Sequence, residues 1–197
     1  MSISAEDIKN LREITGAGIM DCKEALKEAN GNIDEAMKVL RKKGLATAAK
    51  KASREANEGV IGSYIHSNSK IGVLVEVNCE TDFVAMTNDF QEMVKNIAMH
   101  IAASDPKFVR REEVTEDILK QEREIYLDQA KASGKPDNIA EKIVDGKMNK
   151  YYSEYCLLEQ PYVKDPDMTI EAYVTSMIAK VGENIKIARF ARFQLGQ

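Results

Sequence analysis

The chain has 197 residues, of which 44% are hydrophobic and 30% are charged, so it can form one large domain or two small ones with a substantial core. Its formal charge of -4 and its pI of about 5.4 argue against general binding to phosphate backbones, so nucleic acid is not the expected partner. No stretch reaches the roughly 18 apolar residues of a membrane span, and the start lacks a signal-peptide pattern. We therefore expect a cytoplasmic protein without a membrane segment.

The cysteines and histidines indicate no chemistry of their own. Cys22, Cys79 and Cys156 are odd in number, widely spaced and outside any CxxC pair, so reduced and mostly buried thiols are expected. His66 and His100 lie far apart and complete no catalytic or metal-binding motif. We expect no enzyme activity, no metal and no cofactor.

The first helix is predicted over residues 5–14. Ser4 and Asp7 approximate a capping box at its start, and apolar residues follow at helical spacing. Gly16 and Gly18 are expected to end it, because glycine is a weak helix former.

Two more short helices complete a predicted three-helix domain over residues 1–45. Ile19 opens a second apolar stripe, whereas Met20 falls off this stripe and is expected to face outward, although such exposure is often incidental. A third helix begins after Asn32 and is expected to end at Gly44, in the left-handed conformation that glycine favours.

The next segments predict a connector, a hairpin and a helix. Residues 46–57 are rich in alanine, lysine and arginine, which favours a helical connector. Val-rich and alternating patterns over residues 60–66 and 71–79, separated by a polar turn, predict a β-hairpin. Helical spacing returns over residues 90–101 and stops before Pro106.

A helical hairpin is predicted next, with helices over residues 114–132 and 138–158 and a turn over residues 133–136.

The end of the chain predicts a loop, a helix and a strand. Pro161 and Pro166 mark the loop, followed by a helix over residues 169–181 and a strand over residues 185–195. Together with the hairpin, this strand predicts an α+β core over residues 58–197, with about three antiparallel strands packed with helices.

Two exposed side chains are of interest for binding. Thr81-Asp82-Phe83 follows a strand and precedes a helix, so it is expected to be a loop tip that presents an aromatic ring beside a carboxylate. The alternative is that Phe83 folds back and plugs the sheet. His100 follows Met99 of the helical stripe by one position, which is typical of a histidine on the helix surface.

Several segments resemble one protein family in its own order. Residues 15–26 (TGAGIMDCKEAL) and 75–85 (VEVNCETDFVA) resemble the signature stretches of elongation factor Ts, the exchange factor of elongation factor Tu. Residues 96–106 (NIAMHIAASDP), 134–148 (GKPDNIAEKIVDGKM) and 181–196 (VGENIKIARFARFQLG) resemble further family segments. The likeness extends through nearly the whole chain.

The resemblance implies a fold, a function and a site. It implies an N-terminal module similar to ubiquitin-associated (UBA) domains, followed by an α+β core. It also implies a guanine nucleotide exchange factor that binds GDP-bound elongation factor Tu, disturbs its magnesium and phosphate site and promotes GDP release during translation elongation. The implied partner-binding residues are Arg12, Ile19, Met20, Thr81, Asp82, Phe83, Val84 and His100. Position 19 is commonly methionine in the family, so Ile19 departs slightly from the pattern.

A single TDF block and a single GENI strand resemble the short form of the family. The resemblance implies a homodimer in a 2:2 complex, without direct contact to nucleic acid or membrane. The C-terminal strand is the expected self-pairing edge, where Ala191 offers no thiol for a disulfide. The alternative function is a passive protein-binding scaffold with a UBA-like module.

Overall fold

The computed structural model describes residues 3–132 and 136–196, so most of the turn predicted over residues 133–136 lies outside it. The chain divides into two compact units, and each is described by itself. The first unit contains Met1–Ile61, Glu76–Val94 and Ala172–Ile187, and the second contains Gly62–Val75, Lys95–Glu171 and Ala188–Gln197.

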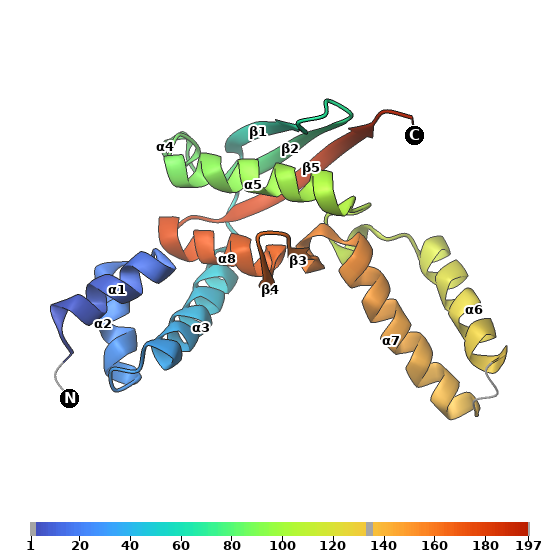
Figure 1. The fold of residues 1–197 in the computed structure, drawn as a ribbon, viewed down its shortest axis with the longest axis horizontal. Helices are drawn as coiled ribbons and strands as arrows, with labels where there is room; N and C mark the ends of the chain where they lie inside the picture. The colour runs from blue at the N-terminus through green and yellow to red at the C-terminus, as the bar shows by residue number, and fades with distance from the viewer. Residues whose placement is uncertain (1–2, 133–135, 197) are drawn as a thin grey trace. The chain divides into compact units, whose positions relative to one another are not determined.

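The N-terminal helices of the first unit are α1 (Ala5–Thr15), α2 (Ile19–Glu28) and α3 (Ile33–Lys51), which pack on one another (Figure 1). The predicted capping box is confirmed, because Ser4 accepts a hydrogen bond from the Asp7 backbone while the Asp7 carboxylate accepts one from the Ser4 backbone. These bonds satisfy N–H groups that have no partner inside the helix.

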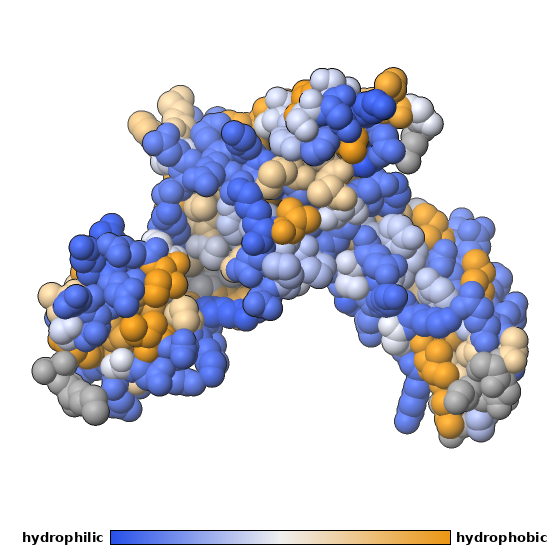
Figure 2. All heavy atoms as spheres, in the orientation of Figure 1, coloured by the Kyte–Doolittle hydropathy of each residue, from blue (hydrophilic) through white to orange (hydrophobic). Residues whose placement is uncertain are grey.

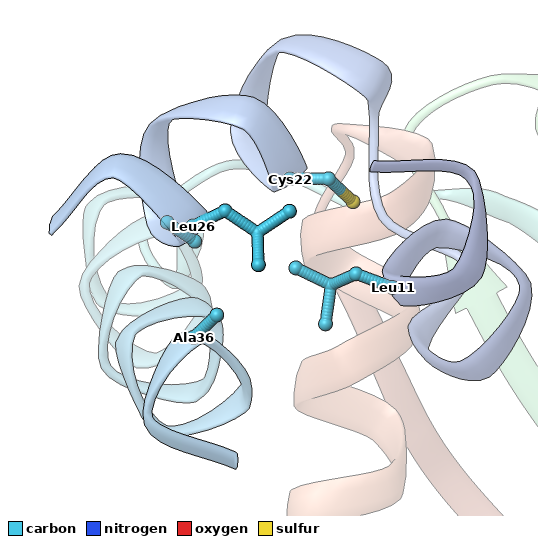
Figure 3. Packing of buried hydrophobic residues seen from close by; sticks show 5 residues of the cluster. Leu11, Cys22, Leu26 and Ala36 are labelled. Atoms are coloured by element: carbon cyan, nitrogen blue, oxygen red, sulfur yellow. The ribbon is translucent and has the colours of Figure 1, made fainter. Parts of the chain in front are cut away.

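The core between these helices is built from small and branched apolar side chains. Figure 3 shows Leu11, Cys22, Leu26 and Ala36 converging from α1, α2 and α3, and all four are fully buried. These side chains and the partly buried apolar residues packed against them form the core that holds the three short helices together.

Gly44 does not end the third helix, and this prediction was wrong. Helix α3 continues through Gly44 to Lys51, so the predicted third helix and the first half of the connector form one helix, whereas residues 52–57 are not helical. Gly44 is buried, and a Cβ placed on it would lie 3.5 Å from the Cβ of Ala179. The alanine-rich sequence that follows and this close packing outweigh the low helix propensity of one glycine.

The three-stranded sheet has the order β1-β2-β5. Its strands are β1 (Glu58–Ile65), β2 (Ile71–Cys79) and β5 (Ile185–Gln194). The His66 backbone N–H donates to the Ile71 carbonyl at 2.9 Å and closes the predicted hairpin. The Leu195 N–H donates to the Lys70 carbonyl at 2.8 Å, so the end of β5 lies beside the start of β2 and these strands are antiparallel.

Three helices lie next to strands β2 and β5 in the chain, two after β2 and one before β5. Helix α4 (Asp82–Ala85) follows β2, α5 (Asn88–Ser104) covers the predicted 90–101 helix, and α8 (Ile170–Val181) precedes β5. The Thr81-Asp82-Phe83 segment is therefore the start of a short helix and not a loop, because the Thr81 side chain caps α4.

The second unit contains the predicted helical hairpin, formed by α6 (Glu116–Ala132) and α7 (Asp137–Tyr155), which lie side by side (Figure 1). Short 3-10 turns, η1 (Arg111–Glu113) and η2 (Leu157–Glu159), lie at its base, where Val114, Tyr151 and Cys156 form a buried cluster.

The two prolines, Pro161 and Pro166, predicted a loop, but the segment that contains them also forms strands. It forms a two-stranded antiparallel sheet of β3 (Pro161–Tyr162) and β4 (Asp165–Thr169). Among the described residues this sheet holds only β3 and β4, so each strand has an outer edge where the N–H that proline lacks would have no strand to bind, and proline is tolerated there. The α+β class is confirmed, and none of the described helices is long and apolar enough to cross a membrane.

Candidate functional site

The first candidate site is the knuckle, residues 81–86, which comprises Thr81, helix α4 and Met86. The Val84 N–H donates to the Thr81 hydroxyl at 3.4 Å, while Ala85 is buried and fixes the inner side of the turn. Phe83 is 79% exposed and Met86 is 74% exposed. Phe83 therefore does not fold back to plug the sheet.

Residues that follow the knuckle hold its carbonyl groups. The Thr87 hydroxyl donates to the Val84 carbonyl at 2.8 Å and accepts from the Phe90 N–H at 3.3 Å. The Gln91 side-chain amide donates to the Ala85 carbonyl at 2.6 Å. The C-terminal side of the knuckle is thus tied to the first turn of α5.

The first residue of the knuckle, Thr81, is held by the turn between α8 and β5. The Glu183 carboxylate accepts from the Thr81 N–H at 3.1 Å and from the Thr81 hydroxyl at 2.7 Å. Hydrogen bonds to an ionised group are roughly twice as strong as neutral ones, so an exposed aromatic is mounted on a firmly held backbone.

Two exposed residues and one buried contact of this unit were missed by the sequence reasoning. Met86 lies three positions after Phe83, and this spacing places both side chains on one side of a helical turn. Met86 could therefore have been predicted from the sequence as an exposed neighbour of Phe83. Ile14, at the end of α1, is also exposed. Glu183 gave no local signal, because its partner Thr81 lies 102 positions away in the chain.

The thiol nearest the knuckle is not arranged as a nucleophile. Cys79 is buried, and its Sγ lies 3.1 Å from the Thr81 carbonyl. Burial, and secondarily the nearby Glu183 charge, raises the pKa of Cys79, which keeps it in the protonated form. Cys22 and Cys156 are also free and buried, as predicted, and burial raises the pKa of Cys156 to about 11.

The second candidate site is formed by the anchor residues, Arg12, Ile19 and Met20. Met20 is 63% exposed, as predicted from its position off the apolar stripe. Ile19 was placed on that stripe, and this was wrong, because it is also exposed at the first position of α2, before the helix turns toward the core. Arg12 is exposed in the last turn of α1, and hydrophobic side chains gather over the α1–α2 part of the unit (Figure 2).

His100 lies in the second unit and is not on a helix surface, contrary to the sequence interpretation. It is 0% exposed. Its Nε2 lies 2.9 Å from the Gln160 side-chain oxygen, and its Nδ1 accepts from the Val163 N–H at 3.3 Å. The β3–β4 segment, predicted as a loop, thus covers a side of α5 that was expected to face solvent.

The partners of His100 define its protonation. Because the Val163 N–H occupies Nδ1, the proton belongs on Nε2, where it is donated to Gln160. The Gln160 amide nitrogen donates in turn to the carbonyls of Ser104 and Glu154. Burial lowers the pKa of His100, so the ring is neutral and connects α5 to the segment that follows α7.

The outer face of the sheet carries apolar residues in the second unit. They are Ile65, Leu74, Phe193 and Leu195. Ile65, Leu74 and Phe193 alternate along their strands with more buried neighbours, so they project from the side of the sheet opposite its core, and Leu195 follows directly after the end of β5. A group of exposed apolar side chains of this kind suits a protein surface better than water.

Within the described parts of the chain, no three His, Cys, Asp or Glu side chains gather in a group that could hold a metal ion. The predicted site residues of the first unit instead include three exposed apolar side chains, Ile19, Met20 and Phe83, and two exposed charged ones, Arg12 and Asp82. Surfaces of this composition are suited to recognise another protein.

Comparison with known proteins identifies the family. The family model for elongation factor Ts matches residues 1–197. The chain is 58% identical to elongation factor Ts of Geobacter sulfurreducens and 60% identical to that of Geotalea daltonii, in each case over 100% of this chain and 91% of the relative. It is 55% identical to elongation factor Ts of Thermosipho melanesiensis, over 99% of this chain and 100% of the relative. With a family match over its full length and relatives at 55–60% identity, this chain belongs to the elongation factor Ts family.

Proposed function

We propose that this chain is the guanine nucleotide exchange factor of elongation factor Tu and acts by binding, not as an enzyme, in the cytoplasm. The observation that supports this most is Phe83, an aromatic side chain that is 79% exposed on a short helix held at both ends. With Met86, which is 74% exposed, Phe83 forms an apolar patch on the knuckle, and exposed patches of this kind mark surfaces that bind other proteins.

Exchange follows from opposed binding of the factor and the nucleotide. Whatever free energy the factor removes from GDP binding, GDP removes equally from binding of the factor. The factor therefore needs a contact that is favourable only when the partner's nucleotide site is distorted. No covalent step is required, and the buried, protonated thiols described above are in keeping with this.

The knuckle supplies this contact in our proposal. Phe83 enters the partner beside the magnesium and phosphate site, with Thr81 and Val84 supporting the turn. Asp82 brings a carboxylate that competes for ligands of the magnesium ion, whose charge otherwise neutralises the phosphates. Burial of the Phe83 ring contributes about 1.5 to 3 kcal/mol, which corresponds to roughly a tenfold to hundredfold weakening of nucleotide binding.

The anchor residues have a different role. Ile19 and Met20 bury apolar surface against another part of the partner, and Arg12 adds a charged contact beside them. Because these contacts form with either nucleotide state, they raise the affinity of the factor and position the knuckle.

His100 enters the proposal as a buried support. Both of its ring nitrogens are used within the chain, so it stabilises the segment at Gln160 and Val163 and does not contact the partner directly. Direct contact would require this segment to move away.

We also propose that two chains pair through the exposed sheet face at Ile65, Leu74, Phe193 and Leu195 and bind two partner molecules. β5 lies at an edge of the sheet, which leaves its face and edge open for a second copy. Light scattering should give twice the 22.0 kDa chain mass, and Phe193→Lys should return it to 22.0 kDa. A wild-type mass of 22.0 kDa would rule out the pairing.

Release of a fluorescent GDP analogue tests the function. Elongation factor Tu loaded with the analogue is mixed with excess GDP and increasing amounts of the chain, and the release rate is recorded. We expect the rate to rise and saturate. The alternative, a passive scaffold, binds with an unchanged release rate, so binding measured by light scattering without accelerated release would reject the proposal.

A further inference from the structure

The turn between α8 and β5 makes hydrogen bonds to residues that lie more than 100 positions away in the chain. Gly182 has a φ of 78° and ends α8, which leaves Glu183 and Asn184 to point toward the end of β2. One oxygen of Glu183 accepts from the backbone N–H groups of Glu80 and Thr81, at 3.2 and 3.1 Å. Its other oxygen accepts from the Thr81 hydroxyl at 2.7 Å.

The contacts are reciprocal. The Glu80 carboxylate accepts from the Asn184 backbone N–H at 2.6 Å and lies 3.3 Å from the Arg54 guanidinium. The Asn184 side chain is buried and donates to the Arg54 carbonyl at 2.7 Å. The backbone bond from Asn184, and secondarily Arg54, holds the pKa of Glu80 below its ordinary value. These residues, all in the first unit, join the exit of α3, the end of β2 and the α8–β5 turn.

The Thr81 hydroxyl transmits this arrangement to the knuckle. Because its proton is donated to Glu183, its lone pair faces the Val84 N–H and caps α4. This hydroxyl therefore contributes, with the backbone bond from Ala85 to the Thr81 carbonyl, to the direction in which α4 leaves the strand. A carboxylate that accepts three bonds is a strong restraint on two consecutive residues.

We infer that Glu183 is a positioning residue for nucleotide exchange: it fixes Thr81 and thereby holds Phe83 in the direction that enters the partner. The inference rests on the proposed exchange function. Glu183 itself need not touch the partner. Without it, Phe83 still reaches its pocket but must be ordered first, and that cost reduces the rate of the step that needs the wedge.

The hydrogen bonds, and not the negative charge, carry this role. Glu183→Gln keeps one oxygen for the two backbone N–H groups, and its amide can face the Thr81 hydroxyl, so it should largely preserve the knuckle. Glu183→Ala removes every acceptor. Glu92→Ala is the matched control, because Glu92 is an exposed carboxylate on α5 in the same unit.

Mobility of residue 83 is measured first, in the free chain. The sequence contains no tryptophan, so Phe83→Trp introduces a single fluorescent reporter. We expect the anisotropy decay of Trp at position 83 to show a larger fast component when Glu183→Ala is added. Glu183→Gln and Glu92→Ala should leave it unchanged. If Glu183→Ala does not fold, Thr81→Val, which replaces the hydroxyl with a methyl group and so removes its bond to Glu183, should show the same larger fast component.

Exchange is measured next, in chains that retain Phe83. Glu183→Ala should lower the maximal GDP release rate about tenfold (about 1.4 kcal/mol) and change the half-saturating concentration much less, with Glu183→Gln near wild type. A general loss of structure would instead lower the unfolding temperature and raise the half-saturating concentration.

The outcomes separate this inference from the proposed function. An unchanged anisotropy decay in folded Glu183→Ala overturns the positioning role, even if wild type accelerates release. Increased mobility with an unchanged maximal rate also overturns it. If wild type itself does not accelerate release, the proposed function fails, and with it the role of Glu183 in exchange.

Discussion

Phe83 and His100 are two aromatic residues that the same family resemblance marked for partner binding, and the structure treats them in opposite ways. Phe83 is 79% exposed, and the residues on either side of it are held: Glu183 binds Thr81, Thr87 binds the Val84 carbonyl and Gln91 binds the Ala85 carbonyl. His100 is 0% exposed, and both of its ring nitrogens are engaged within the chain.

The difference teaches that a shared motif does not specify one kind of role. When the backbone that carries an exposed side chain is already fixed by hydrogen bonds, binding to a partner orders only the side chain. The loss of conformational entropy on binding is therefore small. A buried and doubly bonded imidazole can reach a partner only after bonds inside the chain are broken. The first is suited to contact and the second to support.

The largest expected effect comes from truncating the exposed ring. Phe83→Ala should lower the maximal rate of GDP release by roughly tenfold to a hundredfold, since it removes an apolar contact worth about 1.5 to 3 kcal/mol. The free energy of unfolding should change by less than about 0.5 kcal/mol, because the ring is exposed. Stopped-flow release and urea unfolding check both. A large loss of stability would show that the ring packs within the chain.

His100→Ala should act on stability first. The change leaves the Val163 N–H and the Gln160 side-chain oxygen without their partner, which costs about 1 to 3 kcal/mol for an unsatisfied buried group. Urea unfolding measures this loss. His66→Ala is the control, because His66 is exposed. An unchanged unfolding free energy, with a reduced release rate, would instead assign His100 a direct contact.

Met20→Ala should have a smaller and different effect. Loss of one exposed anchor contact should raise the half-saturating concentration of the factor roughly fivefold, about 1 kcal/mol, without changing the maximal release rate. A titration of the release rate separates these two quantities. A lower maximal rate would place Met20 with the knuckle and not with the anchor residues.

The smallest effect concerns pH. Burial lowers the pKa of His100 in the folded chain below its ordinary value of 6.5, so the unfolded chain binds the extra proton more readily. The contribution of the neutral, buried His100 to the free energy of unfolding is therefore complete above pH 6.5. It is lost as the pH falls from 6.5 through the lowered pKa of His100 in the folded chain. Unfolding of wild type and His100→Gln at pH 7.5 and pH 5 should show a larger acid loss for wild type. Equal losses would mean that His100 is not the group responsible.

Local signals predicted much of the fold. Ser4 and Asp7 identified the start of α1, because a capping box depends only on neighbouring residues. The alternating residues of the hairpin and the position of Met20 were predicted correctly for the same reason. Gly44 failed, because packing against Ala179 and the helix-favouring residues after it decided its conformation.

The site depends more on contacts between distant segments. The apolar stripe of α5 predicted that only one side of this helix is buried and that His100 lies on the exposed side. The neighbours of His100 are also buried, so this part of α5 is covered on several sides; they are Ile97, Ala98, Ile101 and Ala102. The cover includes β3 and β4, whose prolines predicted a loop. Glu183 likewise meets Thr81 only because the chain returns to the end of β2 after 102 positions.

Photo-crosslinking from position 83 tests the central claim most directly. A photoreactive phenylalanine analogue replaces Phe83, the complex with elongation factor Tu is irradiated, and mass spectrometry locates the joined peptide. We expect crosslinks to the segments of elongation factor Tu that border the magnesium ion and phosphates of GDP. Crosslinks confined to surfaces remote from the nucleotide, in a complex that forms normally, would contradict the account.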